Sequence, residues 1–475
     1  MLFPTTDFAI FFCIVFLVHW LLKPSTTPWK VFMIIASYVF YAWWDFRFVA
    51  LLAGVSLVAQ LGGIVVWRTE NERYRRIALV GAVTATLFPL LYFKYYSFFA
   101  LNLTNALDGF GVGSVVPLLQ ITLPVGISFF TFMAISYIVD IYRNELVPTG
   151  WMDFLLYLSF FPHLVAGPIV RGDELIPQLK SARNPRRIDF SRGTWLILGG
   201  LFKKVVISSY VATTIVDPIF ADPGRHAALE VLFAIYGYAV VIYADFSGYT
   251  DIAIGVAMLL GYRFPENFNR PYSARSLQDF WRRWHITLSR WLRDYLYIPL
   301  GGSRKGEGRT YVNIVLTMVL GGLWHGAGWT FVAWGALHGA GQALGHFRRS
   351  RRIAAGLTPQ PNEPGAIARQ RIITFQVVCL GWVFFRADSI ASAFDVLTRL
   401  VTGWTQPAPL VSLLMVAVII GMVGLQWLPG RLSGRVQVAY SRMAPAMQAI
   451  FLALALFVIT TLGPQGVAPF IYFQF

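Results

Sequence analysis

Long apolar runs recur along most of this 475-residue chain, and they constrain its fold more than any other feature. A helix needs about 20 mostly apolar residues to cross the hydrocarbon core of a bilayer. Runs that approach or reach this length are Phe8–Leu22, Val31–Trp44, Phe48–Trp67, Ile77–Leu101, Leu410–Leu428 and Ala444–Leu462. Only 13% of the residues are charged, against roughly 25% in soluble domains. A soluble fold could not cover this much apolar surface, so the sequence predicts an integral membrane protein.

Positive charge collects between the apolar runs. The net charge is +16, but the basic residues form neither a tail nor a soluble basic domain, so nucleic acid is not an expected partner. They gather in four stretches that have more Lys and Arg than Asp and Glu: Arg68–Arg76, Arg171–Arg192, Arg263–Arg309 and Phe347–Arg371. The positive-inside rule places such stretches in the cytoplasm. Lys23 and Lys30 flank the first short loop, so the same rule predicts an extracytoplasmic N-terminus.

The number of runs between two of these stretches predicts one incomplete crossing. Three apolar runs, Ile77–Leu101, Ile121–Tyr142 and Trp151–Val170, separate Arg76 from Arg171, and three full spans would leave Arg171 on the wrong side. The last run contains FPHLVAGP, whose prolines and glycine disfavour a continuous helix. We predict that this run enters and leaves on one face beside an interior cavity, because irregular backbone at membrane depth must be enclosed by protein or water.

Two of the basic stretches carry further patterns. In Asp279–Tyr297, apolar side chains at helical spacing are interleaved with arginines, which predicts an amphipathic helix at the cytoplasmic face. Phe347–Arg371 contains RRSRR and TPQPNEPG, which predicts a flexible loop. The chain is then one transmembrane domain, residues 1–475, with N-terminal spans in 1–120, a core in 121–346, a cytoplasmic loop in 347–371 and C-terminal spans in 372–475.

His325 is the strongest candidate for chemistry. It lies in the apolar stretch Val312–Leu344 among glycines, which permit close approach of backbone or ligand. An ionisable residue at membrane depth suggests function by default, and a neutral imidazole suits the role of general base. A structural hydrogen bond to a neighbouring helix is the alternative. His338, in WGALHG, fits a supporting role and simple packing equally well.

Other polar residues carry weaker signals. His285, in WRRWHITLS, fits either a second catalytic group or a residue that orients a partner, and His163 lies on the predicted re-entrant segment. Asp245, in an apolar run, is expected to pair with Arg or His, because buried carboxylates are rarely left uncompensated. The sequence has no HExxH and no GxxxxGK[ST] motif, and Cys13 and Cys379 form no CxxC pair. No metal site is therefore predicted.

Beyond these local patterns, the chain resembles the membrane-bound O-acyltransferases, and within them the membrane subunits that acetylate alginate. The resemblance extends in collinear order over nearly the whole chain. It is carried by SYVFYAWWDFRF (Ser37–Phe48), LPVGISFFTFMAISYIVDIYR (Leu123–Arg143), FFPHLVAGPIVR (Phe160–Arg171), YADFSGYTDIAIG (Tyr243–Gly255), the run from FPENFNRPY to RDYLYIPLGG (Phe264–Gly302), LGGLWHGAGWTFVAWGALHG (Leu320–Gly339), GWVFFRA (Gly381–Ala387) and the terminal FIYFQF.

The resemblance implies an all-α, polytopic transmembrane helical bundle in which re-entrant and interfacial helices surround a central tunnel. It implies that His325 of WHGAG is the catalytic residue and that His285 is the second signature histidine of the family. The residues that it implies for the tunnel or for substrate binding are Trp324, His163, Asp245, Arg282, Trp281, Trp284 and His338.

The same resemblance implies an enzyme that takes an acyl group, expected to be acetyl, from a cytoplasmic thioester such as acetyl-CoA. Arg and Lys at the cytoplasmic face suit the phosphates of this donor, and no permanently bound cofactor is expected. The implied acceptor is a polysaccharide outside the cell membrane, reached directly or through an extracytoplasmic serine-esterase-like relay protein. The expected location is a bacterial inner membrane. Alginate, cellulose, peptidoglycan and other polysaccharides all remain open as acceptors.

Two other functions stay open. A transporter or flippase of a lipid-linked glycan or a small anion also requires many spans, a cavity and basic loops, but it does not predict the two histidine segments. A non-catalytic scaffold for a polysaccharide synthase would tolerate replacement of both histidines. Substrate turnover, as opposed to substrate movement, separates these functions from an acyltransferase.

Overall fold

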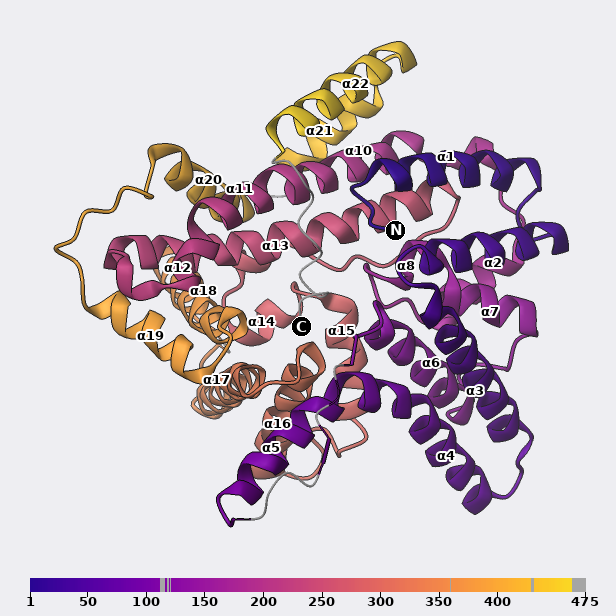
Figure 1. Ribbon diagram of the computed structural model, residues 1–475, viewed down its shortest axis with the longest axis horizontal. Helices are drawn as coiled ribbons and strands as arrows, with labels where there is room; N and C mark the ends of the chain where they lie inside the picture. The colour runs from indigo at the N-terminus through magenta and orange to yellow at the C-terminus, as the bar shows by residue number, and fades with distance from the viewer. Residues whose placement is uncertain (112–115, 118, 120, 359, 429–430, 464–475) are drawn as a thin grey trace. The chain divides into compact units, whose positions relative to one another are not determined.

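The computed structural model describes residues 1–111, 116–117, 119, 121–358, 360–428 and 431–463 (Figure 1). The terminal FIYFQF segment lies outside these residues. Within the described residues the regular elements are helices, and no strand is present. The chain divides into two compact units, residues 1–193 with 253–265 and residues 194–252 with 266–475.

Six helical segments of the described residues are long and apolar enough to cross a membrane. They are Phe46–Arg68, Glu72–Asp108, Phe190–Ala221, Ala228–Leu259, Pro364–Arg386 and Pro445–Leu462. Three shorter apolar helices accompany them, Thr6–Leu21, Ile127–Tyr142 and Leu413–Trp427. The predicted all-helical, polytopic architecture is confirmed, and helices lie where the terminal apolar runs predicted them.

The first unit contains α1 (Thr6–Leu21), α2 (Thr27–Ala42), α3 (Val49–Arg68), α4 (Glu72–Leu90), α5 (Tyr96–Asp108), α6 (Ile127–Tyr142), α7 (Trp151–Ser159), α8 (Phe161–Leu164) and α9 (Gly172–Lys180). Helix α6 packs against both α3 and α4 (Figure 1). A buried polar cluster supports this packing. The Tyr137 hydroxyl donates to Gln60 Oε1 over 2.8 Å and accepts from the Thr149 backbone N–H over 3.0 Å. Pairing of this kind removes the cost of burying polar groups.

The predicted break within Trp151–Val170 is confirmed. Helix α7 ends at Ser159, α8 is a single turn from Phe161 to Leu164, and irregular backbone follows. Every residue from 156 to 170 is buried in protein. The backbone around Gly126, which has φ of +76°, approaches so closely that a Cβ there would lie 2.6 Å from the Leu164 carbonyl oxygen. Protein therefore encloses the irregular segment on the side of the helix break as well as along its length.

The second unit contains most of α10 (Phe190–Leu201), the π-helical turn η4 (Phe202–Ser208), most of α13 (Ala228–Leu259), α14 (Leu277–Trp281), α15 (Ile286–Leu292), η8 (Arg293–Tyr297), α16 (Glu307–His325), α17 (Trp329–Ala354), α18 (Pro364–Arg386), α19 (Ile390–Val401), α20 (Leu413–Gly424), α21 (Arg431–Ser441) and α22 (Pro445–Leu462), with shorter turns between them. Gly200 and Gly248 bring α10 and α13 into contact, because a Cβ on either would lie 2.5 or 2.8 Å from the other's carbonyl oxygen.

Helices α16 and α17 form a tight hairpin and lie side by side in Figure 1. Glycines line their interface. A Cβ at Gly322 would lie 2.2 Å from the Phe331 carbonyl oxygen, and one at Gly335 would lie 2.5 Å from the Met318 carbonyl oxygen. Small residues of this kind let helix backbones approach closely. The hairpin fixes the position of His325, which is the last residue of α16.

Two predictions about the basic stretches are wrong. Asp279–Tyr297 is not one amphipathic helix, because α14 ends at Trp281 and α15 begins at Ile286. The helix breaks because His285 adopts a left-handed conformation, with φ of +41°. The stretch 347–371 is a loop only in part, since α17 continues to Ala354 and α18 begins at Pro364. Arginine favours helix and is stabilised near a helix C-terminus, which accounts for the helical RRSRR.

Candidate active site

The ring of His325 is enclosed by aromatic side chains. Only 2% of the residue is exposed. Its ring centroid lies 4.9 Å from that of Trp324, 5.0 Å from that of Trp334 and 5.3 Å from that of Phe385. These neighbours come from α16, α17 and α18. The packing of three helices therefore holds the imidazole in an apolar environment that excludes water.

His285 also lies near the Trp324 ring. It is fully buried at the start of α15, and its ring centroid lies 6.0 Å from that of Trp324 and 4.7 Å from that of Phe246 on α13. The structure thus brings the two histidines that the sequence singled out against one indole ring. His285 lies outside the helices long enough to cross a membrane, and burial lowers the pKa of its ring to about 3. The ring is therefore neutral near neutral pH.

Asn267 is a polar partner of His285 that the sequence reasoning missed. Its side-chain oxygen lies 3.1 Å from His285 Nδ1, and the residue is 1% exposed. It belongs to the FPENFNRPY segment, but nothing local distinguishes it from the exposed Asn269 two residues later. Only the tertiary fold brings it to the histidine.

His338 and the predicted tryptophans extend the aromatic layer. His338 is fully buried, its Nδ1 lies 3.3 Å from Trp281 Nε1, and its ring centroid lies 4.9 Å from that of Trp334. Trp334 therefore contacts both His325 and His338. Trp284 packs on Trp382 with a centroid distance of 5.0 Å. Trp281 and Trp284 therefore belong, with the third predicted tryptophan Trp324, to the layer that surrounds the histidines.

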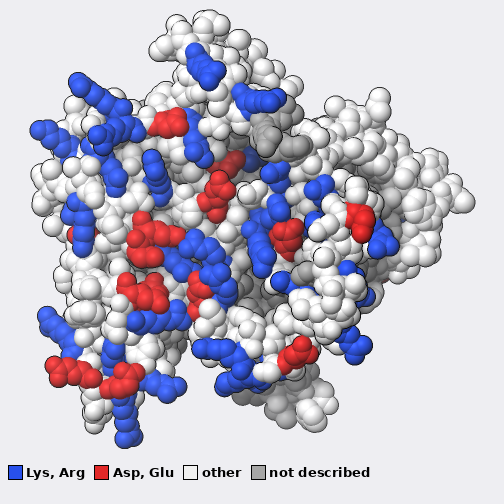
Figure 2. Space-filling model, turned by 180° about the vertical axis from the view of Figure 1, so that it is seen from behind, with Lys and Arg blue, Asp and Glu red and all other residues white. Residues whose placement is uncertain are grey.

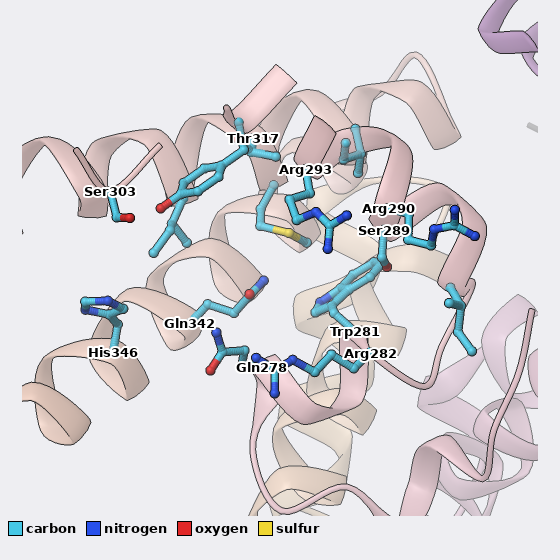
Figure 3. Close-up of a pocket in the computed structure, with 15 residues that line it drawn as sticks. Gln278, Trp281, Arg282, Ser289, Arg290, Arg293, Ser303, Thr317, Gln342 and His346 are labelled. Carbon is cyan, nitrogen blue, oxygen red and sulfur yellow. The ribbon is translucent and has the colours of Figure 1, made fainter. Parts of the chain in front are cut away.

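A cavity of about 460 Å³ adjoins this layer in the second unit (Figure 3). It has both charged and apolar lining, and the residues that line it are Gln278, Trp281, Arg282, Ile286, Ser289, Arg290, Leu292, Arg293, Tyr297, Ser303, Ile314, Thr317, Met318, Gln342 and His346. His285 and His325 are not among these described lining residues. Trp281 is shared, however, because it lines the cavity and also contacts His338.

Asp245 binds a lysine rather than the predicted Arg or His. Its carboxylate accepts from Lys204 Nζ, and both side chains are almost completely buried. Asp251 follows about one and a half helical turns later on α13, and its carboxylate accepts from Lys203 Nζ over 2.5 Å. Two neighbouring lysines of η4 thus form ion pairs with α13. Sequence analysis did not predict these partners, because they lie 41 and 48 residues away along the chain.

His163 lies in the first unit, whereas the other predicted site residues lie in the second. It is fully buried, and its Nε2 lies 2.9 Å from the Tyr157 carbonyl oxygen. Because a carbonyl only accepts, Nε2 carries the hydrogen. The ring stacks on Phe264 with a centroid distance of 5.3 Å. Within its own unit, His163 therefore closes the irregular segment after α7.

Comparison with known proteins identifies the family. The sequence model of the MBOAT, membrane-bound O-acyltransferase family, matches residues 132–359. A probable alginate O-acetylase AlgI of Azotobacter vinelandii is 36% identical over 100% of both chains. This chain belongs to the membrane-bound O-acyltransferase family. The acyltransferase is also 40% identical to the probable alginate O-acetylase AlgI of Pseudomonas aeruginosa, over 83% of this chain and 74% of the relative. A peptidoglycan O-acetyltransferase of Helicobacter pylori is 37% identical, over 78% and 73%.

The arrangement suits acyl transfer by this membrane-bound O-acyltransferase. Both signature histidines fall within the matched residues. Each ring is buried among aromatic side chains, and exclusion of water protects a reactive acyl donor from hydrolysis. The cavity that shares Trp281 with the aromatic layer is lined by three arginines, and the arginine side chain is well suited to bind phosphate.

Proposed function

We propose that this O-acyltransferase moves an acetyl group from cytoplasmic acetyl-CoA across a bacterial inner membrane toward hydroxyls of an extracytoplasmic polysaccharide. The observation that carries the proposal is the position of Trp281, which lines the arginine-rich cavity and contacts His338 in the layer around His325. A donor held in the cavity would have its thioester close to the buried histidines. The names of the relatives, which specify alginate and peptidoglycan, support a polysaccharide as acceptor.

The donor site is assigned to the cavity between α14, α15, α16 and α17. Arg282, Arg290 and Arg293 line it, and arginine binds phosphate oxygens with two parallel hydrogen bonds. Its volume of about 460 Å³ falls within the range of roughly 300–1,000 Å³ found for small-molecule sites. The arginines belong to the stretch 263–309, which the positive-inside rule places in the cytoplasm. Basic side chains are also spread over the face of the molecule shown in Figure 2.

The chemistry assigned to His325 is that of a general base. Its ring takes the proton of an acceptor hydroxyl while the hydroxyl oxygen attacks the thioester carbonyl carbon. Collapse of the tetrahedral intermediate breaks the carbon–sulfur bond, and the departing sulfur receives the proton from His325. His285 orients the acceptor hydroxyl. Burial lowers the pKa of the His285 ring to about 3, so this neutral ring suits a hydrogen-bonding role.

The acceptor is either a sugar hydroxyl or the serine hydroxyl of an extracytoplasmic relay protein that passes the acetyl group to polysaccharide. Both acceptors present the same nucleophile to the thioester. They differ in size and in where the final transfer occurs, so purified components distinguish them.

Reconstituted vesicles test the proposal. Acetyl-CoA labelled in its acetyl group is supplied on the face that carries residues 263–309, and free CoA thiol is measured together with label in oligosaccharide or relay protein on the other face. The proposal predicts CoA release that is stoichiometric with acceptor labelling. Movement of intact donor or of lipid-linked glycan without CoA release would identify a transporter and overturn the proposal.

A further inference from the structure

Asn267 makes an unusual number of contacts to one short turn. Its side-chain oxygen lies 3.1 Å from His285 Nδ1, 2.9 Å from Thr287 Oγ1 and 3.2 Å from the Thr287 backbone nitrogen. Its backbone carbonyl accepts from the Ile286 N–H over 2.9 Å. One buried residue therefore binds three consecutive residues at the start of α15.

These contacts determine which nitrogen of His285 carries the proton. The Thr287 backbone N–H can only donate, so the Asn267 atom that faces it is the amide oxygen. The amide nitrogen then faces Thr250 Oγ1, which lies 3.5 Å away. An amide oxygen can only accept, so His285 Nδ1 must be a donor. In a neutral imidazole the other nitrogen, Nε2, is then the acceptor.

The same contacts hold a backbone conformation that residues other than glycine rarely adopt. His285 has φ of +41° and ψ of +56°, in the left-handed region, and such residues persist only where their surroundings enforce them. A further backbone hydrogen bond lies beside the Asn267 contacts: the Arg283 carbonyl accepts from the Asn269 backbone N–H over 2.9 Å. Segment 267–269 thus fixes the turn that separates α14 from α15.

We propose that Asn267 is the positioning residue of His285: it holds the imidazole in the Nδ1–H tautomer and so makes Nε2 the nitrogen that accepts a hydrogen bond from the substrate hydroxyl. The inference rests on the proposed function only for the role of His285 in acyl transfer. In metal and triad sites, a partner that orients a histidine in this way sets its tautomer and its direction. Asn267 performs the same task here without touching the substrate.

Three substitutions separate this role from simple packing. Asn267→Leu keeps the approximate volume and removes the acceptor, so we expect kcat to fall about 10–100-fold, as for other partners of functional histidines. Asn267→Asp keeps an acceptor oxygen and should restore activity to within about tenfold of wild type. Asn269→Leu, at the exposed neighbour, should leave kcat unchanged. Monodisperse elution of each variant in detergent confirms folding.

The tautomer itself is measured by nitrogen NMR on protein with isotope-labelled histidine, with the His285 signals assigned from their loss in His285→Gln. We expect the proton on Nδ1 in wild type and a shift toward Nε2 in Asn267→Leu. A proton on Nε2 in the wild-type protein would overturn the inference, as would Asn267→Leu with unchanged tautomer and unchanged kcat. If His285→Gln were fully active, the role of His285 in the proposed function would fail, while the tautomer measurement would still decide the role of Asn267.

Discussion

Trp281 Nε1 donates a hydrogen bond to His338 Nδ1 over 3.3 Å. Because an indole N–H only donates, His338 Nδ1 is the unprotonated nitrogen of a neutral ring. Trp281 lines the cavity, and His338 packs on Trp334, whose ring also contacts His325. This bond therefore couples the wall of the proposed donor site to the environment of the proposed base.

Removing one partner of that hydrogen bond should lower the free energy of unfolding more than removing both partners. His338→Phe leaves the buried Trp281 N–H without an acceptor, which should lower the free energy of unfolding by about 1–3 kcal/mol. The double variant Trp281→Phe/His338→Phe removes donor and acceptor together and should recover part of this loss. Thermal unfolding of wild type, both single variants and the double variant in one detergent measures the coupling. Strictly additive effects would show that the bond contributes nothing.

The cavity arginines should affect donor binding more than turnover. Arg290→Gln removes a charged donor from the cavity lining, and loss of a charge-assisted hydrogen bond of about 1.5–3 kcal/mol should raise the KM for acetyl-CoA roughly tenfold or more. The matched control is Arg283→Gln. Arg283 binds Asp279 over 2.8 Å and is not part of the lining. Steady-state kinetics compare the two, and an equal change in both variants would rule out a specific role for the cavity.

The buried ion pair between Lys204 and Asp245 should be essential to the second unit. Asp245→Asn leaves a buried ammonium group without its counter-charge, which should destabilise the protein by about 3–5 kcal/mol. Lys203 and Asp251 form the control pair, because their side chains are 19% and 29% exposed and Asp251→Asn should cost less. Replacement of both partners, Lys204→Met with Asp245→Leu, should recover much of the stability. The melting temperature of each variant in detergent measures its relative stability. An unchanged melting temperature for Asp245→Asn would contradict the prediction.

Membrane orientation can be tested at the end of α17. A reporter fused after Arg352 follows the RRSRR segment, which the positive-inside rule places in the cytoplasm. We expect a cytoplasmic enzyme reporter to be active there and an extracytoplasmic reporter to be inactive. The opposite pattern would reverse the topology and would place the cavity arginines away from the proposed donor.

Local features of the sequence predicted much of the fold, and long-range contacts account for what it could not predict. Three of the span-length helices, Phe46–Arg68, Glu72–Asp108 and Pro445–Leu462, lie on apolar runs that the sequence analysis identified. The break after Ser159 follows from proline chemistry at Pro162. The Asn267 contact with His285 and the Lys204 contact with Asp245 join residues that are 18 and 41 positions apart. No periodicity or motif encodes such contacts. Both histidines could be identified as candidates from the sequence. Their shared contact with Trp324 depends on tertiary packing.

The central claim is that His325 is the base for acyl transfer, and the most direct measurement is thioester turnover by His325→Ala in reconstituted vesicles. The control is His226→Ala, since the His226 side chain is 20% exposed beside Glu230 and belongs neither to the cavity lining nor to the aromatic layer around His325. We predict that His325→Ala loses CoA release and acceptor acetylation by at least about 100-fold, the lower end of the usual range for removal of a general base, while its elution and melting temperature stay close to those of wild type. Wild-type turnover in His325→Ala would contradict the account.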